Sequence, residues 1–115
     1  MGSVVSQLPK SAAASMSSPQ AVFVQNVLKE HKVVIFSKSS CPYCSMAKEQ
    51  FKKLSVPFHV IELDQRQDCN EIQDVLGQMT GQRTVPRCFI DGKFIGGGTD
   101  VKKMYETGAL QKYFS

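Results

Sequence analysis

Apolar and polar positions first become regular after residue 18, where they predict a helix. Ser18 and Pro19 form a helix start, with the serine as the cap and the proline at the first helical position. The apolar positions that give this helix an approximate buried face, up to Glu30, are Val22, Phe23, Val27 and Leu28. Residues 33–36 then form a short, wholly apolar run, which is typical of a central strand covered on both faces. The pattern therefore predicts a helix that leads into the middle of a sheet.

In the middle of the chain, the spacing of apolar positions again alternates between that of a helix and that of a strand. A polar turn over residues 37–40 precedes a second helix over residues 42–54. Residues 58–63 alternate enough to predict a strand, and residues 70–79 return to helical spacing until Gly81 closes the helix. The apolar positions of the two helices are Met46, Ala47, Phe51 and Leu54 in the first and Ile72, Val75, Leu76 and Met79 in the second.

A β-hairpin is predicted near the end of the chain. Strands over residues 87–90 and 93–95 are separated by Asp91 and Gly92, a pair that readily adopts the positive φ angles of a tight hairpin turn. The last elements are a helix over residues 99–106 and an amphipathic turn around Leu110 and Phe114. This order of elements predicts the α/β class, with a four-stranded mixed sheet flanked by helices.

Composition limits the number of domains and the classes of partner. With 115 residues, 42% of them hydrophobic, the chain can bury one core. We expect a flexible Ser- and Ala-rich tail over residues 1–18 and one domain over residues 19–115. The net charge of +4 is spread along the chain, which argues against nucleic-acid binding. No apolar run approaches the about 18 residues that span a bilayer, so no membrane-spanning body is expected.

The four cysteines indicate one reactive pair in a reducing compartment. Cys41 and Cys44 are three positions apart, whereas Cys69 and Cys88 stand alone in unrelated surroundings. Because no secretory signal is recognisable, we expect a cytoplasmic location, with mitochondrial or nuclear pools left open. We expect Cys88 to be a small buried hydrophobe and Cys69 to be an exposed or regulatory thiol, and we assign neither to catalysis.

The surroundings of Cys41 favour a thiolate, the species that attacks disulfides. Cys41 follows a strand and a polar turn and directly precedes the proline that begins the second helix. Its sulfur is therefore expected near unpaired backbone N–H groups and the positive end of the helix dipole, with Lys38 as a nearby cation. Cys44 lies one helical turn further on and suits a resolving thiol. We predict Cys41 as the nucleophile and Cys44 as the resolving cysteine.

A structural zinc site is the alternative for a Cys-x-x-Cys pair. Such a site needs two more ligands at comparable spacing. The candidate ligands are His31, His59, Cys69 and Cys88, and they form no second paired motif. We therefore predict no metal site in this chain.

Three segments resemble the signature segments of vertebrate dithiol glutaredoxins of the Cys-Pro-Tyr-Cys type, for which the glutaredoxin 2 subfamily is one candidate branch. They cover residues 33–44, 84–86 and 96–100, in the family's order and at its separations. The resemblance implies a thioredoxin-like fold, a glutathione mixed disulfide as substrate and a cis peptide bond before Pro86. It also implies partners that are glutathionylated or disulfide-bonded proteins, and a monomer.

The resemblance further implies a glutathione-binding groove. Its residues are Lys38, Gln73 and Arg83 for the glycine carboxylate, Thr84, Val85 and Pro86 for the floor, Thr99 and Asp100 for the γ-glutamyl end, and Tyr43 as an apolar wall beside the sulfur. The backbone of Val85 would pair with glutathione as with an added strand. Three glycines before Thr99 would let the backbone approach the ligand closely.

Two other functions and one modification stay open on the sequence. The family also contains carriers in which Cys41 from two subunits and two glutathiones would hold a [2Fe–2S] cluster, and Pro42 counts against that role. A thioredoxin-like general reductase is a further alternative. Residues 1–6 fit the N-myristoylation pattern at Gly2, so membrane binding is expected only if Gly2 is acylated.

Overall fold

A central sheet with strand order β2-β1-β3-β4 organises the computed structural model, which describes residues 18–115. The predicted Gly2 modification and all of the predicted tail except Ser18 lie outside the described residues. In chain order the elements are α3 (Pro19–Glu30), β1 (Val33–Ser37), α4 (Pro42–Lys53), β2 (His59–Glu62), the 3₁₀ helix η1 (Leu63–Gln65), α5 (Cys69–Thr80), β3 (Arg87–Ile90), β4 (Lys93–Gly96), α6 (Gly98–Thr107) and the 3₁₀ helix η2 (Gln111–Phe114).

The sheet is mixed, as predicted. β1 pairs with β2 in parallel and with β3 in antiparallel, and β3 pairs with β4 in antiparallel through the hairpin turn at Asp91 and Gly92. β1 therefore occupies an inner position in the sheet, where all five of its residues are buried. Within residues 18–115, each helix is too short or too polar to cross a membrane.

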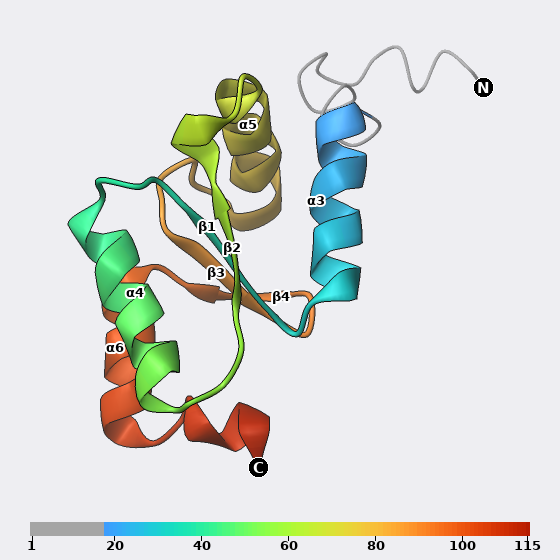
Figure 1. The fold of residues 1–115 in the computed structure, drawn as a ribbon. Helices are drawn as coiled ribbons and strands as arrows, with labels where there is room; N and C mark the ends of the chain where they lie inside the picture. Colours follow the sequence, from blue (N-terminus) through green and yellow to red (C-terminus); the bar gives the residue numbers. More distant parts are fainter. Residues whose placement is uncertain (1–17) are drawn as a thin grey trace.

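Two helical layers cover the sheet, with α3 and α5 on one face and α4 and α6 on the other (Figure 1). Successive side chains of a strand point to opposite faces. Val34 and Phe36 accordingly pack into the core beneath α3 and α5, while Val33 and Ile35 pack into the core beneath α4 and α6. This double coverage explains why residues 33–36 of β1 form an uninterrupted apolar run.

The structure corrects two predicted core positions. Val22 is 48% exposed and Met79 is 38% exposed. The buried residues of α3 are Ala21, Val24, Val27 and Leu28, and Val22 lies off this stripe. Met79 lies in the last turn of α5, where it lines an open cavity beside α3. Ser37, expected in a turn, instead extends β1 by one buried residue.

Candidate active site

Cys41 lies at the N-terminus of α4, where the chain leaves the end of β1. It is the N-cap residue of α4, and Pro42 occupies the first helical position, where no backbone N–H is required. The backbone N–H of Cys44 donates to Cys41 Sγ at 3.2 Å. The sulfur therefore lies at the positive end of the helix dipole, beside backbone N–H groups of the first turn. Cys41 thus occupies the helix-cap position that the sequence predicted.

Cys44 is buried one turn further along α4, with no exposed surface. Burial, and then the hydrogen bond with the Cys41 side chain, raises the pKa of the Cys44 thiol to about 11. A thiol with this pKa stays protonated at neutral pH. The two sulfurs therefore differ in kind: Cys41 is partly exposed, whereas Cys44 is buried and protonated.

The loop before Cys41 is held by an acid that the sequence did not single out. Asp64 Oδ1 accepts hydrogen bonds from the backbone N–H of Ser39 at 3.0 Å and from its hydroxyl at 3.1 Å. These bonds, with the nearby Lys38 charge, lower the pKa of Asp64. The backbone of Lys38 in turn accepts the N–H of Cys41 at 3.1 Å. The signal in the sequence was weak, because Asp64 is simply one acid after a strand.

The segment 84–86 lies beside Cys41. The Cys41 thiol donates to the backbone carbonyl of Val85 at 3.8 Å. The peptide bond between Val85 and Pro86 is cis, which confirms the expectation from the resemblance. Val85 is partly buried and Thr84 is exposed. A ligand bonded to the sulfur of Cys41 would therefore meet this backbone.

The first turn of α6 packs against the first turn of α4, next to the cysteines. Gly98 lies so close to Tyr43 that a Cβ there would be 2.5 Å from the Tyr43 carbonyl oxygen. Asp100 Oδ2 accepts the N–H of Gly97 at 2.8 Å, and Gly96 has a φ of 134°, which favours glycine. The conformation of Gly96 and the packing of Gly98 thus explain two of the three glycines within the protein itself. Gly98 allows close approach to protein backbone, whereas we expected these glycines to let the backbone approach a ligand.

Gln73 and Arg83 are joined to each other and to their own chain. The Gln73 side-chain amide donates to the Arg83 carbonyl at 2.8 Å, and its oxygen accepts from the Cys69 thiol at 3.4 Å. The Arg83 guanidinium pairs with Asp74 at 2.9 Å and donates to the Asn70 carbonyl at 3.3 Å. The Arg83–Asp74 pair is about half exposed, and exposed pairs are worth only about 0–1 kcal/mol, so an anionic ligand can compete for the guanidinium.

Comparison with known proteins gives consistent matches along the chain. The glutaredoxin family matches residues 33–95, which include both cysteines and the 84–86 segment. This chain belongs to the glutaredoxin family. Members of the family are glutathione-dependent thiol–disulfide oxidoreductases, and the chain is an enzyme of this class.

Individual relatives of this glutaredoxin come from plants and animals. Glutaredoxin-C4 of Arabidopsis thaliana is 49% identical over 100 residues, covering 87% of this chain and 74% of that protein. Mitochondrial glutaredoxin-2 of Homo sapiens is 48% identical over 87 residues, covering 76% of this chain and 53% of that protein. The crystal structure of a buckwheat glutaredoxin–glutathione complex is 40% identical, has a TM-score of 0.76 and covers 84% of this chain and 92% of its own. The nearly equal plant and human identities do not single out one branch of the family.

The other two cysteines of this glutaredoxin occupy different settings. Cys88 is fully buried in β3, and burial raises the pKa of its thiol, which confirms it as a small buried hydrophobe. Cys69 is half-buried at the start of α5. Among the described residues, no group of three or more potential metal-binding side chains comes together.

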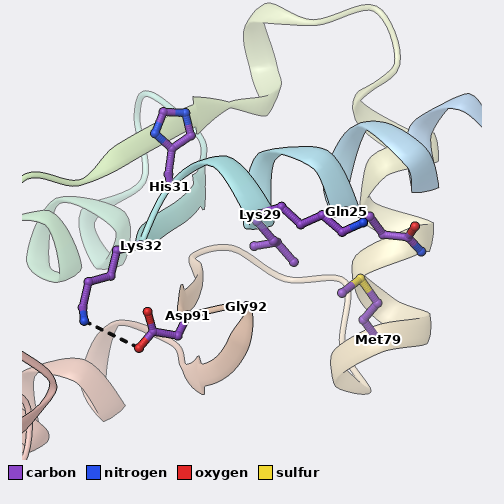
Figure 2. Close-up of a pocket in the computed structure, with 8 residues that line it drawn as sticks. Gln25, Lys29, His31, Lys32, Met79, Asp91 and Gly92 are labelled. Carbon is purple, nitrogen blue, oxygen red and sulfur yellow. Dashed lines mark ion pairs between the residues drawn. The ribbon is translucent and has the colours of Figure 1, made fainter.

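A cavity of about 700 Å³ lies at the opposite end of β1 from Cys41. Its lining comes from the second half of α3, the end of α5 and the hairpin turn (Figure 2). Lys32, on its wall, pairs with Asp91 at 3.6 Å. Because the cavity lies beyond the other end of the central strand, it is separate from the cysteine site of this glutaredoxin.

Proposed function

We propose that this glutaredoxin reduces glutathione–protein mixed disulfides, with Cys41 as the nucleophile and Cys44 as the resolving cysteine. The observation that carries this assignment is the contrast between the two sulfurs. Cys41 accepts a helix N–H and is partly exposed beside the Val85 carbonyl, whereas Cys44 is buried with a raised pKa. Only the first arrangement suits attack on a disulfide from outside the protein.

In the first step, the Cys41 thiolate attacks the glutathione sulfur of the mixed disulfide. A bond forms between Cys41 and glutathione, the original S–S bond breaks, and its electron pair leaves on the substrate thiolate, which takes a proton from solvent. A second glutathione, as its thiolate, then attacks the glutathione sulfur held on Cys41. Oxidised glutathione leaves, and the Cys41 thiolate is restored.

Protein disulfides would follow a dithiol route through Cys44. Cys41 first forms a mixed disulfide with one substrate sulfur, and the other substrate sulfur leaves as a thiolate. Cys44 then loses its proton, attacks Cys41 and releases the substrate as a dithiol, leaving a Cys41–Cys44 disulfide. Two glutathiones reduce that disulfide and leave as oxidised glutathione. The raised pKa of Cys44 keeps it from competing in the first step.

The glutathione moiety would lie along Val85, with its backbone paired to the Val85 backbone as an added strand. Thr84 and Pro86 would complete the floor, and Tyr43, which is 55% exposed, would flank the sulfur. The remaining assigned contacts are Lys38, Gln73 and Arg83 to the glycine carboxylate and Thr99 and Asp100 to the γ-glutamyl end. The first turn of α6 supports the second set, because helix N-terminal amides attract a carboxylate.

The experiment is a glutathione-coupled assay on a glutathionylated peptide. Cys41→Ser is expected to abolish turnover, because it removes the attacking sulfur. Cys44→Ser is expected to retain deglutathionylation but to lose reduction of protein disulfides. Cys69→Ser serves as a control of the same chemistry away from the pair. Equal losses in Cys41→Ser and Cys44→Ser would refute the division of roles.

The proposal includes a monomer in a reducing compartment such as the cytoplasm, since the reaction consumes reduced glutathione. The alternative is a dimer that holds a [2Fe–2S] cluster through Cys41 of two chains and two glutathione thiols. Protein purified without oxygen separates the two. A colourless monomer supports disulfide exchange as the main role, and a brown dimer supports cluster binding.

A further inference from the structure

Arg87 is a buried charge beside the proposed glutathione groove. It is the first residue of β3, directly after Pro86, and only 8% of its surface is exposed. Buried guanidinium groups are normally paired with an acid, because burying an unpaired charge is costly. Within residues 18–115, the ion pairs use Lys32, Lys48, Arg66 and Arg83, and none includes Arg87.

The guanidinium instead binds three oxygens, one at the end of α5 and two in the segment that joins α5 to β3. Nε donates to the Pro86 carbonyl at 3.2 Å, Nη1 to the Thr80 hydroxyl at 3.4 Å and Nη2 to the Thr84 hydroxyl at 3.4 Å. Thr80 is the last residue of α5, so the negative end of that helix dipole faces the cation. The Phe94 ring covers the guanidinium, whose carbon lies 4.8 Å from the ring centroid. These contacts replace a carboxylate partner.

The position of these bonds matters for the nucleophile. Thr84 and Pro86 are the residues on either side of Val85. The Val85 carbonyl accepts a hydrogen bond from the Cys41 thiol at 3.8 Å. A guanidinium that holds both neighbours restricts where the Val85 backbone can lie. Arg87 is itself buried, so it acts on a ligand through this backbone.

We propose that Arg87 is a positioning residue that sets the affinity of the groove for the glutathione moiety, by fixing Thr84 and Pro86 around Val85. The inference rests on the proposed function. The planar guanidinium of Arg87 reaches three separated acceptors at once. A lysine ammonium at the end of a flexible stem does not reproduce this. In the sequence, the available signal was a charged residue at the head of an otherwise apolar strand.

The test compares Arg87→Lys and Arg87→Met with wild type in steady-state kinetics on a glutathionylated peptide. We expect Arg87→Lys to raise KM about tenfold and to change kcat less than about twofold, since about two hydrogen bonds that order the groove are lost. Arg87→Met should raise KM at least as much. The alkylation rate of Cys41 by iodoacetamide should stay close to wild type, because the helix cap is untouched.

Two further variants control for folding and for the loss of a ring-stacked arginine. Arg66 also stacks on an aromatic ring, that of Phe23, and pairs with Asp68 away from Cys41, so Arg66→Lys should leave KM unchanged. Thr80→Val removes one Arg87 acceptor and should raise KM by about twofold to threefold, so it tests the idea even if Arg87→Met fails to fold.

The outcomes separate this inference from the function on which it rests. An active wild type with unchanged KM in Arg87→Lys and Thr80→Val would overturn the positioning role alone. A fall in kcat with unchanged KM would overturn it as well, because that pattern indicates an effect on the chemistry. A wild type that cannot turn over the glutathionylated peptide would overturn the proposed function and the inference together.

Discussion

Gly98→Ala is expected to destabilise this glutaredoxin where the first turns of α4 and α6 meet. A methyl group at Gly98 would lie 2.5 Å from the Tyr43 carbonyl oxygen and 3.1 Å from Tyr43 Cβ. Ordinary van der Waals contact begins at 3.4 Å, so the new carbon is about 0.9 Å too close to a backbone atom. No side-chain rotation can move that oxygen. The two helices must therefore separate or tilt.

Overpacking of this kind typically costs about 1–3 kcal/mol, and we expect about 2 kcal/mol at Gly98. For a domain of this size, such a loss lowers the melting temperature by about 10 °C. The chain contains no tryptophan, so urea unfolding is best followed by far-ultraviolet circular dichroism. Because Tyr43 precedes Cys44 in α4, glutathione-dependent turnover should fall as well.

Gly77→Ala is the matched control for stability. A methyl group there would meet the Cγ atom of Arg83 at 3.0 Å, and this atom belongs to a flexible side chain. Alanine is also favoured over glycine inside a helix by up to about 1 kcal/mol. We expect Gly77→Ala to be neutral or slightly stabilising. A Gly98→Ala variant within about 0.5 kcal/mol of wild type would refute the steric reasoning, since surface substitutions already span that range.

Two further predictions concern titration. With a pKa of about 11, only about one Cys44 thiol in ten thousand is ionised at pH 7, so mass spectrometry after iodoacetamide treatment should find Cys41 modified and Cys44 intact until urea is added; equal labelling of both in the native protein would contradict this. Burial, and then the stacked His31 ring 3.9 Å away, lowers the pKa of His59 below 6.5. The unfolded chain then binds more protons just below pH 6.5, so stability should fall with falling pH in that interval. The urea midpoint of wild type should therefore drop more than that of His59→Gln between pH 7.5 and pH 5, and parallel drops would disprove the link.

Local patterns predicted the order of elements well. The hairpin, the mixed sheet and the helix that starts after Cys41 depend on turn residues, helix caps and apolar periodicity, all of which act within a few residues. The predicted burial of Val22 and Met79 was wrong. Which part of an apolar face is buried depends on where the neighbouring helix lies. Periodicity alone carries no information on that neighbour.

By itself, the sequence determined the position of Cys41 at a helix cap, its spacing from Cys44 and the family resemblance, because each lies in a short continuous segment. Only the tertiary structure decided that Asp64 holds the loop at Ser39, that Gly98 makes room for Tyr43 and that Arg87 lies buried against Thr84 and Pro86. The first two contacts join segments far apart in the chain. The third depends on how α5, β3 and β4 pack around a charge. Burial and partnership of a charged side chain follow from the packing of several elements together, which no single segment of the sequence encodes.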